Sequence, residues 1–370
     1  MDSSYKMKVT NMKTIVGYDR AALDRARCGR VDRRGFIARA AVLGLASAGA
    51  GALSLWAAAG QKIRLATLAP KDTSFHQSLK TMAQKWQNAP GGGVELTIYT
   101  DGTMGGETDM VRRMRVGQLQ AAMLTVAGLS EIDPAVGGLQ KLPLLYRTLE
   151  ELVYVREKLR PIVEQRFTAK GFHLLGWADA GWVRFFSKEP ATTPDEFKKL
   201  KMFVLSSDKD HIEIMQSEGY RAVPLEYTDT LTALQTGMID TVPTTPTYAL
   251  AGQFFGVASH MMEVNWAPLV GGIVITKKAW DALPAEAKPV LTQAATDAAA
   301  ELQAKSRKES DEAVVAMQKR GLTVHKVTAE TEKQWAELGD RIMPRVRGKM
   351  VPADIYDEVQ RLLKEYRAAK

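Results

Sequence analysis

The residues that most often carry catalytic chemistry are scattered along this sequence. Its five histidines form no His-x-x-x-His or His-Glu-x-x-His pair, the spacings that hold zinc in hydrolases; they are His76, His173, His211, His260 and His325. The sequence has no Gly-x-Ser-x-Gly elbow, no Walker lysine and no Gly-x-Gly-x-x-Gly after a strand. We therefore predict a protein that is not an enzyme and that has no metal site and no cofactor.

Two further features bear on chemistry. The glycine-rich segment from Gly102 to Gly106 precedes a helix, where backbone N–H groups could face an anion, although a plain turn is the alternative. The one cysteine, Cys28, lies near the N-terminus. The rest of the chain therefore has no disulfide, no thiolate metal site and no cysteine nucleophile.

The charge is distributed unevenly. The net charge is +8, but residues 1–59 hold 10 Lys and Arg against 4 Asp and Glu, whereas the remaining residues hold 40 against 38. The body of the protein therefore has no electrostatic attraction for nucleic acid, and we predict no nucleic-acid partner.

The first 59 residues have the anatomy of an export signal. Arg33 and Arg34 precede a weakly apolar run from Ala40 to Trp56, and Ala57-Ala58-Ala59 offers a cleavage site. This pattern predicts a twin-arginine signal peptide and a periplasmic location. An uncleaved leader that tethers the protein to the membrane is the alternative, because the apolar run approaches the roughly 20 residues that span a bilayer.

Strands and helices alternate after residue 59. Ile63–Leu68 and Val94–Tyr99 read as strands, and a helical stripe of apolar residues runs through Ser74–Gln87 between them. The sequence Thr193-Pro194-Asp195-Glu196 predicts a capping box. The alternation predicts an α/β fold with a mostly parallel sheet. A helix from about Pro284 to Gln318 would be on the order of 50 Å long, so we expect it to brace two lobes.

Several ordered stretches carry a resemblance to a known family. They are Leu65–Pro70, Gly102–Glu107 with Gly117–Gln120, Leu142–Tyr146, Gly181–Arg184, Pro194–Lys201 and Leu231–Asp240. In this order they resemble the DctP-type substrate-binding proteins of TRAP (tripartite ATP-independent periplasmic) transporters. The resemblance implies a small-molecule ligand, TRAP membrane permease subunits as partners and the possibility of an accessory periplasmic partner.

The resemblance also implies an architecture. It is a two-lobed periplasmic-binding-protein-like fold with mixed, mostly parallel sheets, hinge strands and a long bracing helix, in which the lobes close over the ligand. The expected division is a leader at 1–59, the first lobe at 60–182, the second lobe at 183–242, a return to the first lobe at 243–271, a second-lobe strand and the long helix at 272–320, and a C-terminal strand and helices at 321–370.

One departure from the family bears on the ligand. Where the family has a Lys-Ile-Arg step whose arginine clamps a ligand carboxylate, this chain has Lys201-Met202-Phe203. A bidentate arginine–carboxylate pair is worth about 1.5 to 3 kcal/mol. We therefore predict an apolar or aromatic ligand. A conventional organic acid held by Arg184 is one alternative, and a cofactor-bearing periplasmic enzyme is another. For Arg184 itself, the alternative to ligand binding is an ion pair at the surface or the hinge.

The resemblance extends to other candidate binding residues. Aromatic side chains fall near positions where the family lines its cleft: Trp177, Trp182, Tyr248 and Trp266. Thr244 and Thr245 offer hydroxyls to a neutral ligand, and His76 and Glu107 are polar candidates from the first lobe. Core packing is the alternative for the aromatic residues and for Phe203, and a turn with a helix cap is the alternative for the threonines.

Overall fold

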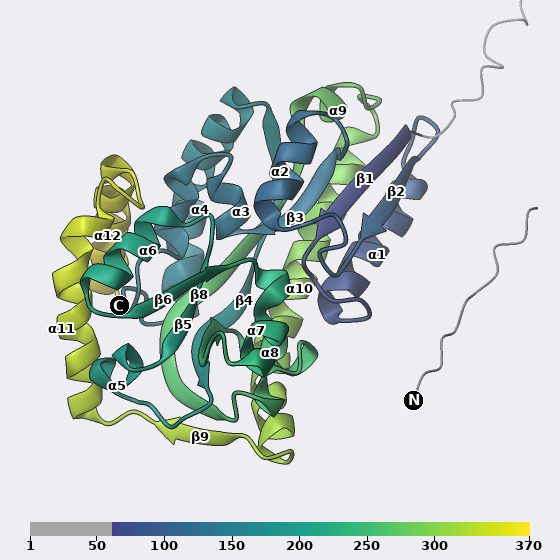
Figure 1. The fold of residues 1–370 in the computed structure, drawn as a ribbon. Coiled ribbons are helices and arrows are strands. Elements are labelled where there is room, and N and C mark those ends of the chain that lie inside the picture. The colour runs from purple at the N-terminus through teal and green to yellow at the C-terminus, as the bar shows by residue number, and fades with distance from the viewer. Residues whose placement is uncertain (1–60) are drawn as a thin grey trace, which may run out of the picture. The chain divides into compact units, whose positions relative to one another are not determined.

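The computed structural model describes residues 61–370 (Figure 1). Its first lobe is built on three parallel strands, β1 (Gln61–Thr67), β2 (Val94–Tyr99) and β3 (Ala121–Thr125), with β1 in the middle. Helices α1 (Ser74–Gln87) and α2 (Glu107–Arg115) connect them. The predicted βα start is confirmed, because Leu79, Met82 and Trp86 bury the apolar stripe of α1 in this lobe's core.

The second lobe repeats the parallel arrangement. Strand β5 (Lys201–Leu205) pairs in parallel with β6 (Arg221–Leu225) and β7 (Thr241–Thr244), and α6 (Lys209–Ser217) and α7 (Thr230–Thr236) connect them. The predicted capping box is confirmed at α5 (Pro194–Lys198), where Thr193 accepts from the Glu196 N–H and Glu196 accepts from the Thr193 N–H.

Two long antiparallel strands, β4 (Phe172–Ser187) and β8 (His260–Thr276), join the lobes into one sheet. The strand order is β2-β1-β3-β8-β4-β7-β5-β6, and β9 (Thr323–Lys326) also pairs with β8. Five of the eight strand pairings are parallel, so the mixed, mostly parallel α/β fold is confirmed. Figure 1 shows β4 and β8 passing from the β1–β3 region to the β5–β7 region.

The length of β8 differs from the prediction. Gly272–Thr276 was expected as a separate strand of the second lobe, but residues 271–275 pair with β3 of the first lobe and continue from His260 without interruption. Pro268 obscured this continuity, because proline is rare inside a central strand. It is tolerated here because Pro268 faces a register shift in β4, where Gly181 adopts a φ of +80°.

Helix α10 (Lys288–Gln318) has 31 residues and is about 46 Å long. Its N-terminal half buries Leu291, Ala294 and Ala298 in the core of the first lobe. Its C-terminal half buries Ala313 and Met317 in the core of the second lobe. The predicted bracing helix is therefore confirmed.

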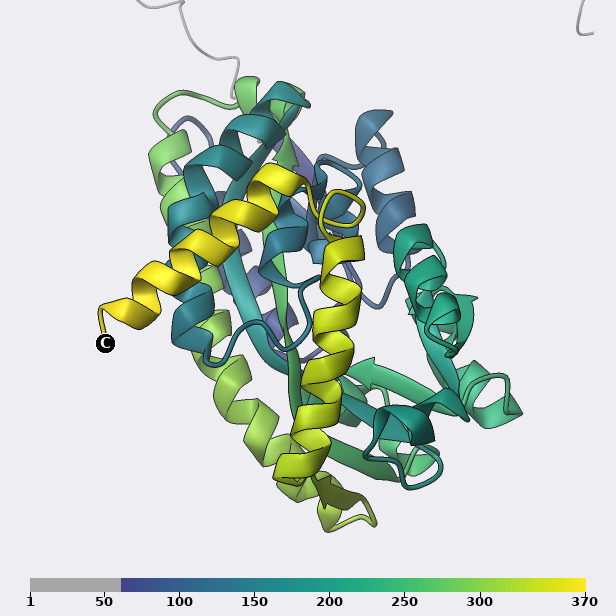
Figure 2. The ribbon, with the colours of Figure 1, turned by 90° about the vertical axis from the view of Figure 1, so that its left-hand side faces the viewer.

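The remaining elements complete the two lobes. They are α3 (Val126–Ser130), η2 (Pro134–Leu139), α4 (Leu149–Ala169), η3 (Tyr227–Asp229), α8 (Pro246–Ala251), η4 (Phe254–Gly256), α9 (Lys277–Asp281), α11 (Ala329–Val346) and α12 (Ala353–Ala368). Figure 2 shows α11 and α12 together on one side of the molecule. Among residues 61–370, no helix is long and apolar enough to cross a membrane, and the predicted leader at 1–59 lies outside the described residues.

A buried carboxylate ties the crossing strands to the helices. The side chain of Asp179, in β4, is completely buried, and Arg307 of α10 donates to both of its oxygens at 3.1 and 2.9 Å. Arg156 of α4 lies 3.9 Å away, and the Ser306 hydroxyl donates to the Asp179 carbonyl oxygen at 3.0 Å. The middle of β4 is thus fixed to both helices.

We expect Asp179→Ala to lower the free energy of unfolding by about 3 kcal/mol, because it leaves the Arg307 and Arg156 guanidinium groups only the exposed carboxylates of Glu150 and Glu157. Urea unfolding followed by circular dichroism measures this change. Lys308→Ala is the control, because it removes an exposed ion pair with Glu312 on the same helix and should leave the midpoint almost unchanged. Equal midpoints for Asp179→Ala and the control would contradict the importance of the buried pair.

Candidate ligand-binding site

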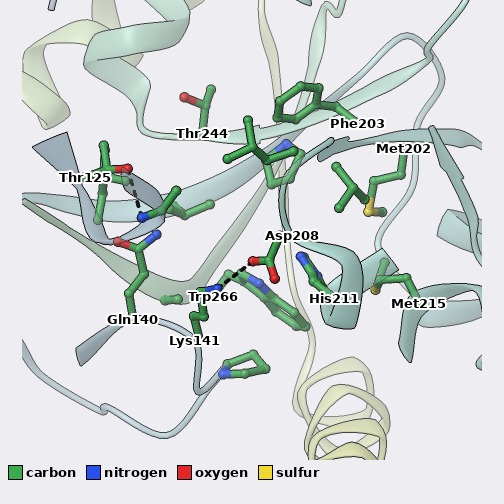
Figure 3. A pocket seen from close by; sticks show the side chains of 18 of the residues that line it. Thr125, Gln140, Lys141, Met202, Phe203, Asp208, His211, Met215, Thr244 and Trp266 are labelled. Carbon is green, nitrogen blue, oxygen red and sulfur yellow. Dashed lines mark hydrogen bonds and ion pairs between the residues drawn. The ribbon is translucent and has the colours of Figure 1, made fainter. Parts of the chain in front are cut away.

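A cavity of about 260 Å³ lies where the lobes meet (Figure 3). Glu107 and Thr125 line it from the first lobe, and Phe203 and Thr244 line it from the second. Trp266, on the crossing strand β8, lines it between them. The cavity is large enough for a small organic molecule, and its position lets lobe motion open and close it.

Aromatic side chains in mutual contact form much of the wall. The Phe203 and Tyr227 rings pack edge to face at 6.0 Å, and Tyr227 and Tyr248 do so at 5.9 Å. On another side, the Trp266 ring contacts Phe185 at 5.2 Å and Trp335 at 5.3 Å. Because each ring is held by its neighbours, these walls are fixed in shape before a ligand enters.

An ion pair crosses the cleft beside these rings. Lys141 follows η2 of the first lobe, Asp208 precedes α6 of the second, and the Lys141 Nζ lies 2.9 Å from the Asp208 Oδ2. Both side chains are largely buried and line the cavity. The charge of Lys141 is therefore already matched by a carboxylate of the opposite lobe.

The first residue of α2, Glu107, is bound by its own lobe. Its carboxylate accepts from the Thr125 N–H and hydroxyl, both at 2.7 Å, and from the Gly128 N–H at 2.8 Å. Burial raises the pKa of Glu107 and outweighs these hydrogen bonds, which lower it. The side chain thus fixes the cavity wall, and its oxygens are largely occupied by the protein.

The lobes approach closely at the glycine-rich segment. A side chain at Gly106 would collide with the Glu226 carboxylate of the second lobe, which also contacts the Ser206 hydroxyl. The segment from Gly102 to Gly106, which the sequence left open between an anion site and a turn, therefore forms a turn that allows this contact across the cleft.

Five of the residues proposed from the sequence line this cavity: Phe203, Glu107, Thr244, Tyr248 and Trp266. Five others do not: Arg184, Trp177, Trp182, His76 and Thr245. The Trp177 and Thr245 side chains are buried, and neither the indole N–H nor the hydroxyl has a hydrogen-bond partner. His76 accepts a hydrogen bond from the Asp72 N–H at 3.0 Å, and Trp182 packs against the core.

Arg184 does not line the cavity, although its neighbours in β4, Val183 and Phe185, do. An Arg184 guanidinium nitrogen lies 3.4 Å from the Glu263 carboxylate. Arg184 is paired across the sheet with Thr244, which lines the cavity, and its buried Nε has no hydrogen-bond partner among the described residues.

Several lining residues were not among the candidates proposed from the sequence. Lys141, Gln140, Asp208, His211, Tyr227 and Trp335 all line the cavity but were not proposed. Lys141 directly precedes the Leu142–Tyr146 stretch, and Asp208 directly precedes α6, but neither position indicates a site without the fold. Trp335 lies far along the chain, in α11.

Two α/β lobes joined by crossing strands, with a ligand-sized cavity between them, define an extracytoplasmic solute-binding protein. Residues 65–348 match the family described as bacterial extracellular solute-binding protein, family 7, DctP. The chain belongs to this family, whose members are non-enzymatic components of TRAP transport and work with membrane permease subunits.

Known relatives agree with this assignment. The chain is 25% identical over 263 residues to the C4-dicarboxylate-binding periplasmic protein DctP of Rhodobacter capsulatus, covering 70% of this chain and 77% of that protein. A TRAP periplasmic solute-binding protein from Shewanella oneidensis with bound succinate has a TM-score of 0.76 at 18% identity, over 82% of this chain and 100% of that one. One from Chromohalobacter salexigens with bound D-glucuronate has a TM-score of 0.72 at 20% identity, over 83% and 100%.

The partly buried His211 makes stability depend on pH. Burial lowers its pKa below 6.5 more than nearby Asp208 raises it, so the folded protein favours the neutral ring. The unfolded chain therefore binds more protons, and this stability is present above about pH 6.5 and is lost as the pH falls below it.

We expect His211→Gln to lose less stability than the wild type between about pH 7.5 and about pH 5.5. The measurement is urea unfolding of both proteins at the two pH values. The pKa values of His173 and His325 are also lowered, but both residues remain in both proteins, so their contributions cancel in the comparison. Identical losses in the two proteins would refute the contribution of His211.

Proposed function

We propose that this protein captures a small organic ligand that is mainly apolar or aromatic and delivers it to a TRAP-type permease. The observation that carries the proposal is the charge of the cavity wall. Four carboxylates line the cavity, those of Glu107, Asp208, Glu218 and Glu226, whereas Lys141 is the only lysine or arginine among the described residues that line it. Asp208 is paired with Lys141 and Glu218 with Arg341 and Arg345, so none of the described lining residues offers an unpaired lysine or arginine to an entering carboxylate.

Apolar side chains line the cavity at or next to the two positions considered for a ligand-binding arginine. Phe203 lines the cavity at the first position. At the second, Val183 lines the cavity, whereas its neighbour Arg184 forms an ion pair with Glu263. Burying a carboxylate without a partner is costly, and a dicarboxylate would carry that cost twice. These contacts favour a ligand with little or no negative charge.

The relatives favour a second candidate. The proteins named above are described with C4-dicarboxylates, succinate or D-glucuronate, all of them acids. In this chain Lys141 could hold an acid if it separated from Asp208, whereas the alternative based on Arg184 would require that side chain to leave Glu263 and reach the cavity.

Export and delivery complete the proposal. The family is extracytoplasmic, and the leader at 1–59 supports transfer to the periplasm by the twin-arginine route, with a membrane tether as the outcome if it is not cleaved. An accessory periplasmic partner that takes the ligand onward belongs to the same proposal. The lobe boundaries proposed from the sequence also remain a proposal.

A thermal-shift screen followed by calorimetry tests the ligand class. We expect neutral aromatic or aliphatic compounds to raise the melting temperature, because they fill the cavity without placing charge beside its carboxylates. Succinate and D-glucuronate should not raise it. Tight binding of either acid, with no response to neutral compounds, would overturn the proposal and support the second candidate.

Two substitutions separate the possible cations. We expect Arg184→Ala to change the dissociation constant of any bound ligand by less than about twofold, because Arg184 forms an ion pair outside the cavity. Lys141→Met should abolish binding of any acid that the screen identifies. Calorimetry on both variants measures the change, and loss of acid binding in Arg184→Ala would instead assign the clamp to Arg184.

A further inference from the structure

The cavity extends along one helix. Trp335, Leu338, Ile342 and Val346 of α11 all line it, at spacings of three, four and four residues that place them on one face. From the first to the last, the helix rises about 16 Å. The apolar face of α11 therefore forms a wall of the cavity over about 16 Å.

The wall that faces α11 is also largely apolar. Met202 of β5 and Ile214 and Met215 of α6 line the cavity there. The exceptions are Glu218, which forms ion pairs with Arg345 at 3.2 Å and Arg341 at 3.5 Å, and Tyr220, whose buried hydroxyl has no partner. This part of the cavity therefore suits hydrocarbon, with one hydroxyl that is free to form a hydrogen bond.

The other part of the cavity is polar. Figure 3 shows Thr125 and Gln140 on one side of the Lys141–Asp208 pair and Met215 on the other. Thr244, whose hydroxyl lies 3.0 Å from that of Tyr227, also belongs to the polar part. The ion pair thus lies between a hydrogen-bonding region and an apolar region.

We infer that the ligand is an elongated amphiphile, an extended hydrocarbon chain or a row of fused rings with one uncharged polar end. The polar end lies near Thr125, Gln140 and Thr244, and the hydrocarbon body passes the Lys141–Asp208 pair and lies along α11. This inference rests on the proposed function and names the shape and polarity of the ligand. A compact sugar acid would leave the apolar region along α11 empty.

The length of the apolar region gives a measurable signature. Each methylene group that moves from water into such a region increases affinity about fourfold. The dissociation constants of the n-alkanols from hexanol to dodecanol, measured by calorimetry on the full folded protein, should fall by this factor per methylene until the chain fills the region.

A variant that blocks the region provides the decisive comparison. We expect Leu338→Trp to weaken dodecanol binding about tenfold or more while hexanol binding stays the same, because only the longer chain reaches this part of α11. Glu337→Trp is the matched control, because it adds the same side chain one residue earlier on the exposed face of α11. If circular dichroism shows that Leu338→Trp is unfolded, Met215→Trp narrows the same region from a partly buried position.

The outcomes separate the inference from the function it rests on. A fourfold gain per methylene that Leu338→Trp abolishes and Glu337→Trp preserves supports the inference. Alkanol binding that does not depend on chain length, or an equal effect of both variants, overturns the inference and leaves capture of an apolar solute intact. Tight binding of succinate without any alkanol binding overturns both.

Discussion

The antiparallel pairing of β4 with β8 is the constraint on which the rest of the structure depends. These strands are the only part of the described sheet that belongs to both lobes, so lobe motion must pass through them. Their three register shifts place irregular backbone at the crossing, where bending disrupts few ladder hydrogen bonds. The same strands carry Val183, Phe185 and Trp266 into the cavity, so hinge and ligand contact are built from one element.

The contacts between the lobes also determine which polar groups of the cavity remain available to a ligand. The Lys141–Asp208 pair joins the lobes across the cleft, and the Glu226 carboxylate reaches the backbone at Gly106. The ion pair links the two lobes, and it also occupies the Lys141 ammonium group, which could otherwise have held a ligand. With Lys141 already paired, the remaining surface of the described cavity wall is mainly aromatic and aliphatic.

The sequence predicted the parts of the fold that depend on local patterns. The α1 stripe, the Thr193 capping box and the long α10 helix are all encoded within one segment each, and all were found. The continuity of β8 was missed because Pro268 argues against a central strand. Only the pairing with β4 shows that the proline lies at a register shift, where it is tolerated. Lys141, Asp208 and Trp335 were missed because they meet only through long-range packing, which no local spacing records.

Membership of the family and identity of the ligand rest on different residues. The match over residues 65–348 reflects backbone turns and core positions that hold two lobes together, and these tolerate many changes of cavity side chain. The cavity wall depends on a few positions, among them Phe203 and Val183, whose hydrocarbon side chains line it, and on α11, whose buried face extends it. Because α11 supplies much of the apolar wall, the C-terminal segment shapes the cavity as directly as the two lobes do.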